Sequence, residues 1–99
     1  MSNLLDDPMM SEPGTLKSEN GGYVKKDVLA KTDAYRRLIA EIDKMMISDA
    51  AINAELLKIR HMPLRKAKLL FIPAKGFSVS QTDILIAELE RKIANKVML

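Results

Sequence analysis

Apolar residues recur at helical spacing along most of this chain, and that period limits its fold more than any other feature. From Val24 to Met46 they fall mostly three, four or seven positions apart, which places them on one face of a helix. Leu85, Leu89 and Ile93 repeat the pattern near the C-terminus. Helices of this kind bury their apolar faces against one another, so the sequence predicts an all-α fold.

Three helix boundaries have recognisable signals. Ser48, directly before Asp49, predicts the N-cap of a second helix, because a serine hydroxyl accepts a hydrogen bond from the free N–H groups of the first turn. Pro63 ends that helix, since proline disfavours helical geometry at the residue before it. Ser80 is the predicted cap of the last helix.

The segment after Pro63 allows two interpretations. Proline suits the first position of a helix, and Leu, Arg, Lys and Ala dominate residues 64–70, so we favour a helix over 64–72. The alternative is a short β-hairpin over residues 69–79, with Gly76 in the left-handed conformation. The prediction is therefore a compact domain of three to four helices, with an α+β fold carrying that hairpin as the alternative.

Residues 1–22 differ from the rest of the chain. They contain Pro8, Pro13, Gly14, Gly21 and Gly22 and show no sustained apolar period. So few apolar side chains do not offset the entropy lost when the segment is ordered. We expect a flexible N-terminal arm over 1–22 and one helical domain over 23–99.

The composition excludes several kinds of functional site. The 99 residues include no cysteine and one histidine, His61. Disulfide scaffolds, thiolate metal sites and cysteine nucleophiles are therefore excluded, and His61 has no carboxylate at helical spacing to orient it. No stretch approaches the roughly 20 apolar residues that span a bilayer. We expect a cytoplasmic protein that is not an enzyme, with no metal, cofactor, small-molecule substrate or membrane partner.

Basic residues gather in the middle of the chain. No acidic residue lies between Glu55 and Asp83, although the net charge of the whole chain is only +3. Such a stretch is either a solvated face or a contact for a polyanion. We take as a candidate anionic-partner patch the residues Arg60, Arg65, Lys66, Lys68 and Lys75.

Methionine is abundant, at seven residues in 99. Its flexible, polarisable side chain is common on surfaces that accept another chain. Met45, Met46 and Leu57 widen the apolar stripes beyond what a small core readily buries, and they are the candidate partner-binding residues. The sequence thus favours a non-catalytic helical interaction module, a regulator or adaptor of bacterial or phage type, that binds a protein partner or itself. The alternative is a DNA- or RNA-binding regulator that uses the basic stretch 58–75.

Overall fold

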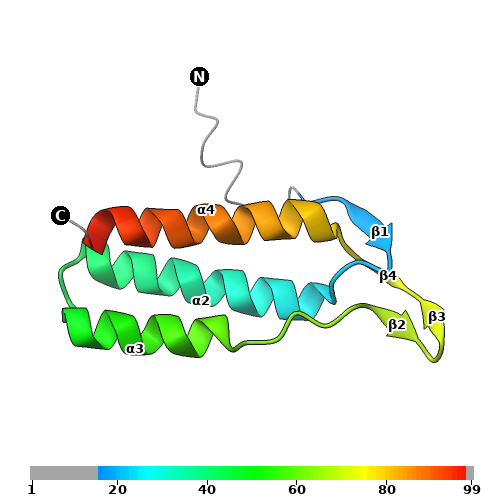
Figure 1. Cartoon of the computed structure of the whole chain (residues 1–99), viewed down its shortest axis with the longest axis horizontal. Helices are drawn as coiled ribbons and strands as arrows, with labels where there is room; N and C mark the ends of the chain where they lie inside the picture. Colours follow the sequence, from blue (N-terminus) through cyan, green and yellow to red (C-terminus); the bar gives the residue numbers. More distant parts are fainter. Residues whose placement is uncertain (1–15, 98–99) are drawn as a thin grey trace, which may run out of the picture.

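A computed structural model describes residues 16–97, and three helices form most of it (Figure 1). They are α2 (Lys25–Asp43), α3 (Asp49–Arg60) and α4 (Val79–Val97). Helix α2 packs against both α3 and α4. The predicted compact domain of three to four helices is confirmed, with three helices among the described residues. Two small antiparallel sheets lie at one end: β1 (Ser18–Asn20) pairs with β4 (Lys75–Phe77), and β2 (Lys68–Leu69) pairs with β3 (Ile72–Pro73).

The core combines the apolar faces of all three helices. The sequence period identified most of its members on α2 and α4, and α3 adds residues at spacings of three and four. The buried cluster consists of Tyr35, Leu38, Ile52, Leu56, Ile59, Leu85, Leu89 and Ile93. Because these side chains occupy one stripe on each helix, the opposite faces are left to charged residues.

The helix caps agree with the sequence at one position and differ at another. Ser48 caps α3 as predicted, since its Oγ accepts a hydrogen bond from the Ala51 N–H at 3.2 Å. The prediction of Ser80 as the N-cap of the last helix is wrong. Helix α4 begins at Val79, so Ser80 lies inside its first turn, and Ser78 Oγ instead accepts from the Gln81 N–H at 3.2 Å.

The helix favoured over residues 64–72 is also wrong. Residues 65–67 are extended and pair with the chain before α2: the Val24 N–H donates to Arg65 O and the Ala67 N–H to Gly22 O, each at 2.7 Å. This tertiary pairing outweighs the local helix propensity. A hairpin does form in the region of the alternative prediction, but its turn is at Leu70–Phe71. Leu70, not Gly76, has a positive φ, of 60°.

Strand β1 lies inside the segment expected to be an arm. Ser18, Glu19 and Asn20 pair with Phe77, Gly76 and Lys75 respectively. Ordered structure therefore extends to the N-terminal side of residue 23, whereas residues 1–15 of the expected arm lie outside the described residues.

The strands cross so closely that two glycines are needed. Tyr23 and Phe77 exchange both backbone hydrogen bonds at 2.9 Å, which draws the neighbouring segments together. A Cβ at Gly22 would overlap the Phe77 carbonyl, and one at Gly76 would overlap the Tyr23 carbonyl. Both positions therefore require glycine because of close backbone approach, not because of an unusual φ.

Candidate functional site

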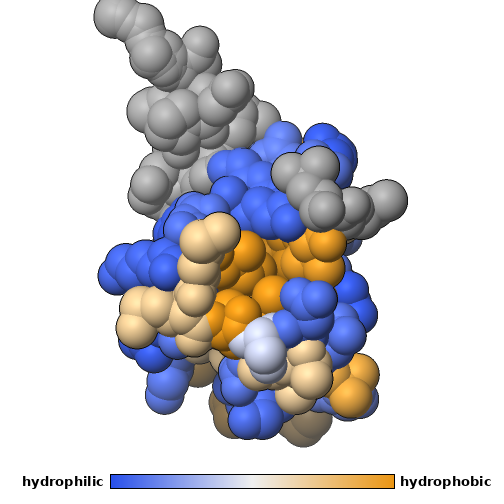
Figure 2. Space-filling view, turned by 90° about the vertical axis from the view of Figure 1, so that its left-hand side faces the viewer, coloured by the Kyte–Doolittle hydropathy of each residue, from blue (hydrophilic) through white to orange (hydrophobic). Residues whose placement is uncertain are grey.

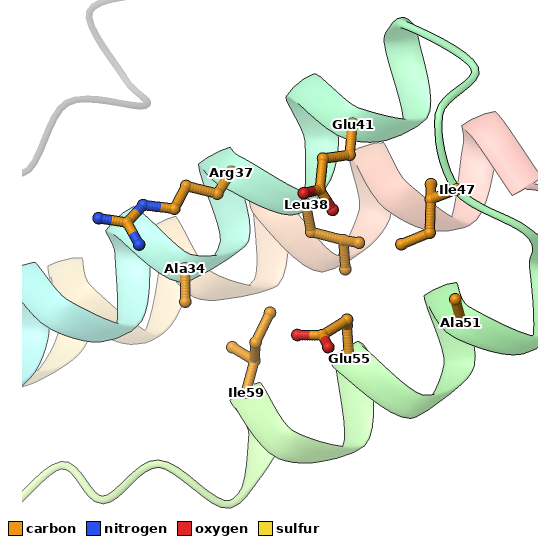
Figure 3. Close-up of a pocket in the computed structure, with 8 residues that line it drawn as sticks. All are labelled: Ala34, Arg37, Leu38, Glu41, Ile47, Ala51, Glu55 and Ile59. Atoms are coloured by element: carbon orange, nitrogen blue, oxygen red, sulfur yellow. The ribbon is translucent and has the colours of Figure 1, made fainter.

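A groove of about 350 Å³ runs between α2 and α3, and Figure 3 shows the side chains that line it. Apolar groups from both helices and from their connection form its floor. The lining residues are Ala34, Arg37, Leu38, Glu41, Ile47, Ala51, Glu55 and Ile59. An apolar floor bordered by charged side chains is the form of site that accepts an apolar segment of another molecule.

The charged residues of the groove differ in how far they are already engaged. Arg37 forms an ion pair with Asp33 at 2.9 Å, and Glu55 forms one with Lys58 at 3.3 Å. Glu41 is exposed and, within residues 16–97, its carboxylate has no hydrogen-bond or ion-pair partner. The groove therefore carries one free negative charge.

Two of the three predicted partner-binding residues lie beside this groove in the α2–α3 connection. Met45 and Met46 are 90% and 74% exposed, and they precede Ile47, which lines the groove. Figure 2 shows apolar surface on this end of the molecule, bordered by hydrophilic side chains. Leu57 is also exposed but lies in the third turn of α3, so the structure separates it from the methionine pair.

The predicted anionic-partner patch divides into two groups. Both arginines are engaged within the protein. Arg60 forms two hydrogen bonds to the Glu90 carboxylate, at 3.0 and 2.7 Å, and Arg65 forms a similar pair to Asp27, at 2.9 and 2.8 Å. Their charges are therefore largely balanced by internal carboxylates.

The three lysines of the patch lie together on the stem of the β2–β3 hairpin and remain exposed. Lys68 belongs to β2, Lys75 to β4, and Lys66 lies two residues before β2. The Lys66 ammonium lies 5.8 Å from the centre of the Tyr23 ring. The net positive charge of the basic stretch is thus carried mainly by the hairpin stem.

The most exposed apolar cluster of the described residues was missed as a site. Leu69, Leu70, Phe71 and Ile72 form the hairpin tip and are 69%, 85%, 98% and 67% exposed. We define these four residues as the hairpin tip. The available signal was four consecutive apolar residues between Lys68 and Pro73. A helix over this segment would have buried part of that run, so the interpretation as a helix concealed the exposed cluster.

Several titratable groups with shifted pKa values join the helices. Tyr35 Oη donates to Glu90 Oε2 at 2.6 Å, and burial raises the pKa of Tyr35. Hydrogen bonds from Arg60 lower the pKa of Glu90. Burial lowers the pKa of Lys31, whose Nζ donates to the carbonyls of Arg60 and Met62 at 3.3 and 2.9 Å. Each group has a partner on another element, as expected of structural links between α2, α3 and α4.

His61 lies at the C-terminal end of α3, where its Nδ1 is 2.8 Å from Leu57 O. Residues 16–97 hold no group of three or more His, Cys, Asp or Glu side chains placed to bind a metal ion. In the same range, no helix is both long enough and apolar enough to cross a membrane. The absence of enzymatic activity stays a prediction.

Comparison with known proteins adds no relative: no family model, no curated protein and no solved structure matches this chain.

Proposed function

We propose that this protein is a small non-catalytic interaction module that binds an apolar segment of a protein partner in the groove between α2 and α3. The observation that carries the proposal is the groove itself, with its apolar floor and adjoining exposed methionines. Met45 and Met46 extend the apolar surface beyond the groove, and their flexible side chains adapt to a partner's shape.

The free carboxylate of Glu41 indicates the chemistry of that partner. An amphipathic helix lays its apolar residues into a groove of this kind, and a basic residue on its border would pair with Glu41. The partner is therefore an amphipathic segment with apolar side chains one helical turn apart and a lysine or arginine beside them. The proposal includes a second copy of this chain as a source of such a segment.

The alternative function, binding of DNA or RNA through the basic stretch, receives less support. Arg60 and Arg65 are the side chains best suited to bidentate phosphate contacts, and both are held by internal carboxylates. Only Lys66, Lys68 and Lys75 of the predicted patch remain for a phosphate backbone.

The test is capture of partners from an extract of the native cells, with and without nuclease. Ala51→Phe fills the groove, and Glu41→Lys reverses its free charge. Asn95→Lys is the matched control, since it adds a lysine at an exposed position on α4. We expect both groove variants to lose a protein that the wild type and Asn95→Lys retain, with or without nuclease. Capture that Ala51→Phe leaves intact contradicts the groove, and capture that nuclease abolishes favours the nucleic-acid alternative.

A further inference from the structure

The hairpin tip is a second exposed apolar surface, distant from the α2–α3 connection along the helices (Figure 1). Four consecutive large apolar side chains are at least two-thirds exposed, and Phe71 is almost entirely in water. Scattered apolar residues are normal on protein surfaces, but a contiguous protruding group marks a contact site.

The hairpin stem is firmly attached to the rest of the domain. The Gly21 N–H donates to Ala74 O at 2.8 Å, and the Ala67 N–H donates to Gly22 O at 2.7 Å. The Ala74 N–H in turn donates to Ala67 O at 3.0 Å, which closes the base of the hairpin. The tip is therefore presented to solvent by an anchored stem.

The turn keeps a large apolar residue where the backbone favours glycine. Leu70, the first of the two turn residues, has a φ of 60°. A two-residue hairpin turn with positive φ at its first position normally holds glycine there. Leucine at this position strains the backbone and keeps one more apolar side chain at the tip, a combination typical of functional sites.

Positive charge surrounds the stem. Lys66, Lys68 and Lys75 are exposed on it. Nearby, Asp27 forms an ion pair with Arg65. Asp83 and Glu19 keep their negative charge, since they accept hydrogen bonds from neutral donors, the Tyr23 hydroxyl and the Val79 N–H respectively. The hairpin itself, residues 66–75, contains three lysines and no acidic residue, so an anion that approaches the tip meets these lysines first.

In place of the absence of a membrane partner expected from the sequence, we propose that the hairpin tip inserts into the interfacial region of an anionic lipid bilayer, with the stem lysines on the lipid phosphates. A strand advances about 3.4 Å per residue, so Leu70 lies roughly 7 Å beyond Lys68. That length matches the ~5–10 Å to which interfacial segments enter a bilayer. Lysine side chains are long enough to keep their ammonium groups at the phosphates while their stems lie along apolar surface.

The composition of the tip favours a bilayer over a macromolecular pocket. The tip offers no polar side chain that would fix its orientation in a protein pocket, and the interior of a bilayer requires none. A nucleic acid would have to unstack its bases to accept Leu70 and Phe71. This inference concerns a surface separate from the α2–α3 groove and does not depend on the proposed protein partner.

Vesicle flotation with the full-length chain tests the proposal, with phosphatidylcholine vesicles compared with mixed phosphatidylcholine–phosphatidylserine vesicles. We expect binding to the mixed vesicles that weakens as salt rises. Phe71→Ser should lower the partition coefficient by roughly 10-fold or more. Lys68→Gln and Lys75→Gln should each lower it about 5-fold on the mixed vesicles only.

Leu70→Gly keeps the test independent of folding. It removes an apolar side chain and relieves the positive φ, so vesicle binding should fall roughly 10-fold while thermal stability is retained or raised. Met46→Ser and Lys44→Gln are matched controls at the α2–α3 connection and should bind vesicles as the wild type does. The chain has no tryptophan. Phe71→Trp should therefore give a fluorescence blue shift on the mixed vesicles that Met46→Trp does not give.

Three results would overturn the proposal. They are absence of wild-type binding to mixed vesicles, equal binding by the wild type and the tip variants, and tip-dependent capture of a protein or of duplex DNA without vesicle binding. The groove variants Glu41→Lys and Ala51→Phe should bind vesicles normally, so failure of this proposal is distinguishable from failure of the proposed protein contact.

Discussion

Neutralising Asp27 tests how the hairpin stem is held to the helices. Asp27 lies in the first turn of α2 and is buried. Its carboxylate accepts three hydrogen bonds from Arg65: one from the backbone N–H at 3.0 Å, one from Nε at 2.9 Å and one from Nη2 at 2.8 Å. Arg65 begins the segment that leads into the hairpin, so this one carboxylate links α2 to the stem.

The energy of the link follows from the acidity of Asp27. Hydrogen bonds from the Arg65 side chain and backbone lower its pKa from 3.8 to about 2. One pKa unit corresponds to about 1.4 kcal/mol. The fold therefore stabilises the charged form of Asp27 over its neutral form by about 2 kcal/mol, compared with the unfolded chain. This value is an upper limit, because the Arg65 side chain is 67% exposed and solvent screens the pair.

The direction of the pH effect is determined by the lowered pKa. The folded pKa lies below the unfolded one, so the stabilisation is fully present above the unfolded value near 3.8 and is lost as pH falls toward 2. Asp27→Asn should therefore lower the free energy of unfolding at neutral pH by about 1–2 kcal/mol. It should also flatten the fall in stability across that acid range. Urea unfolding followed by circular dichroism at a series of pH values measures both effects.

Asp33→Asn is the control for this experiment. Asp33 also pairs with an arginine, Arg37, but both side chains are more than half exposed. Its loss should change the free energy of unfolding by less than about 0.5 kcal/mol. If Asp27→Asn unfolds with the same pH dependence as the wild type, the Asp27–Arg65 link does not stabilise the fold and the reasoning is refuted.

Five further substitutions test other parts of the structure. Gly76→Ala places a Cβ against the Tyr23 carbonyl and should lower the free energy of unfolding, measured by chemical denaturation, by more than about 2 kcal/mol. Wild-type stability of this variant would contradict the close approach of the two backbone segments. Ser78→Ala should lower the free energy of unfolding by about 1 kcal/mol and Ser80→Ala by much less. The reverse order would indicate that Ser80, and not Ser78, caps α4. Tyr35→Phe removes one donor to the partly buried Glu90 carboxylate and should lower the melting temperature, with a cost of about 1 kcal/mol. Met46→Lys should leave the free energy of unfolding within about 0.5 kcal/mol of wild type, since a large loss would place Met46 in the core.

The helical part of this fold is readable from the sequence because its signals are local. Leu85, Leu89 and Ile93 repeat at four-residue spacing and are all buried, and Ser48 caps α3 with its own side chain. A period or a cap depends on residues within one or two turns of each other. The predicted apolar face of the first helix extends too far at Met45 and Met46, which follow the last residue of α2.

The hairpin was harder to predict because its partners are distant in the sequence. Residues 65–67 are held extended by hydrogen bonds to residues 22–24, about forty positions earlier. No local pattern reveals that pairing, and the residues themselves favour a helix. The candidate groove depends in the same way on how α2 and α3 dock. The exposed methionines were identified from composition, but the free charge of Glu41 was not.

The pairing of β1 with β4 determines the order in which this small domain assembles. The two strands are almost sixty residues apart, and the three helices lie between or beside them. Closing so long a loop is entropically costly until the helices have brought its ends together, so β1 adds late. A strand that joins late and makes few buried contacts also leaves early. Amide hydrogens of β1 should therefore exchange before those of the three helices, making this strand the first of these elements to open under native conditions.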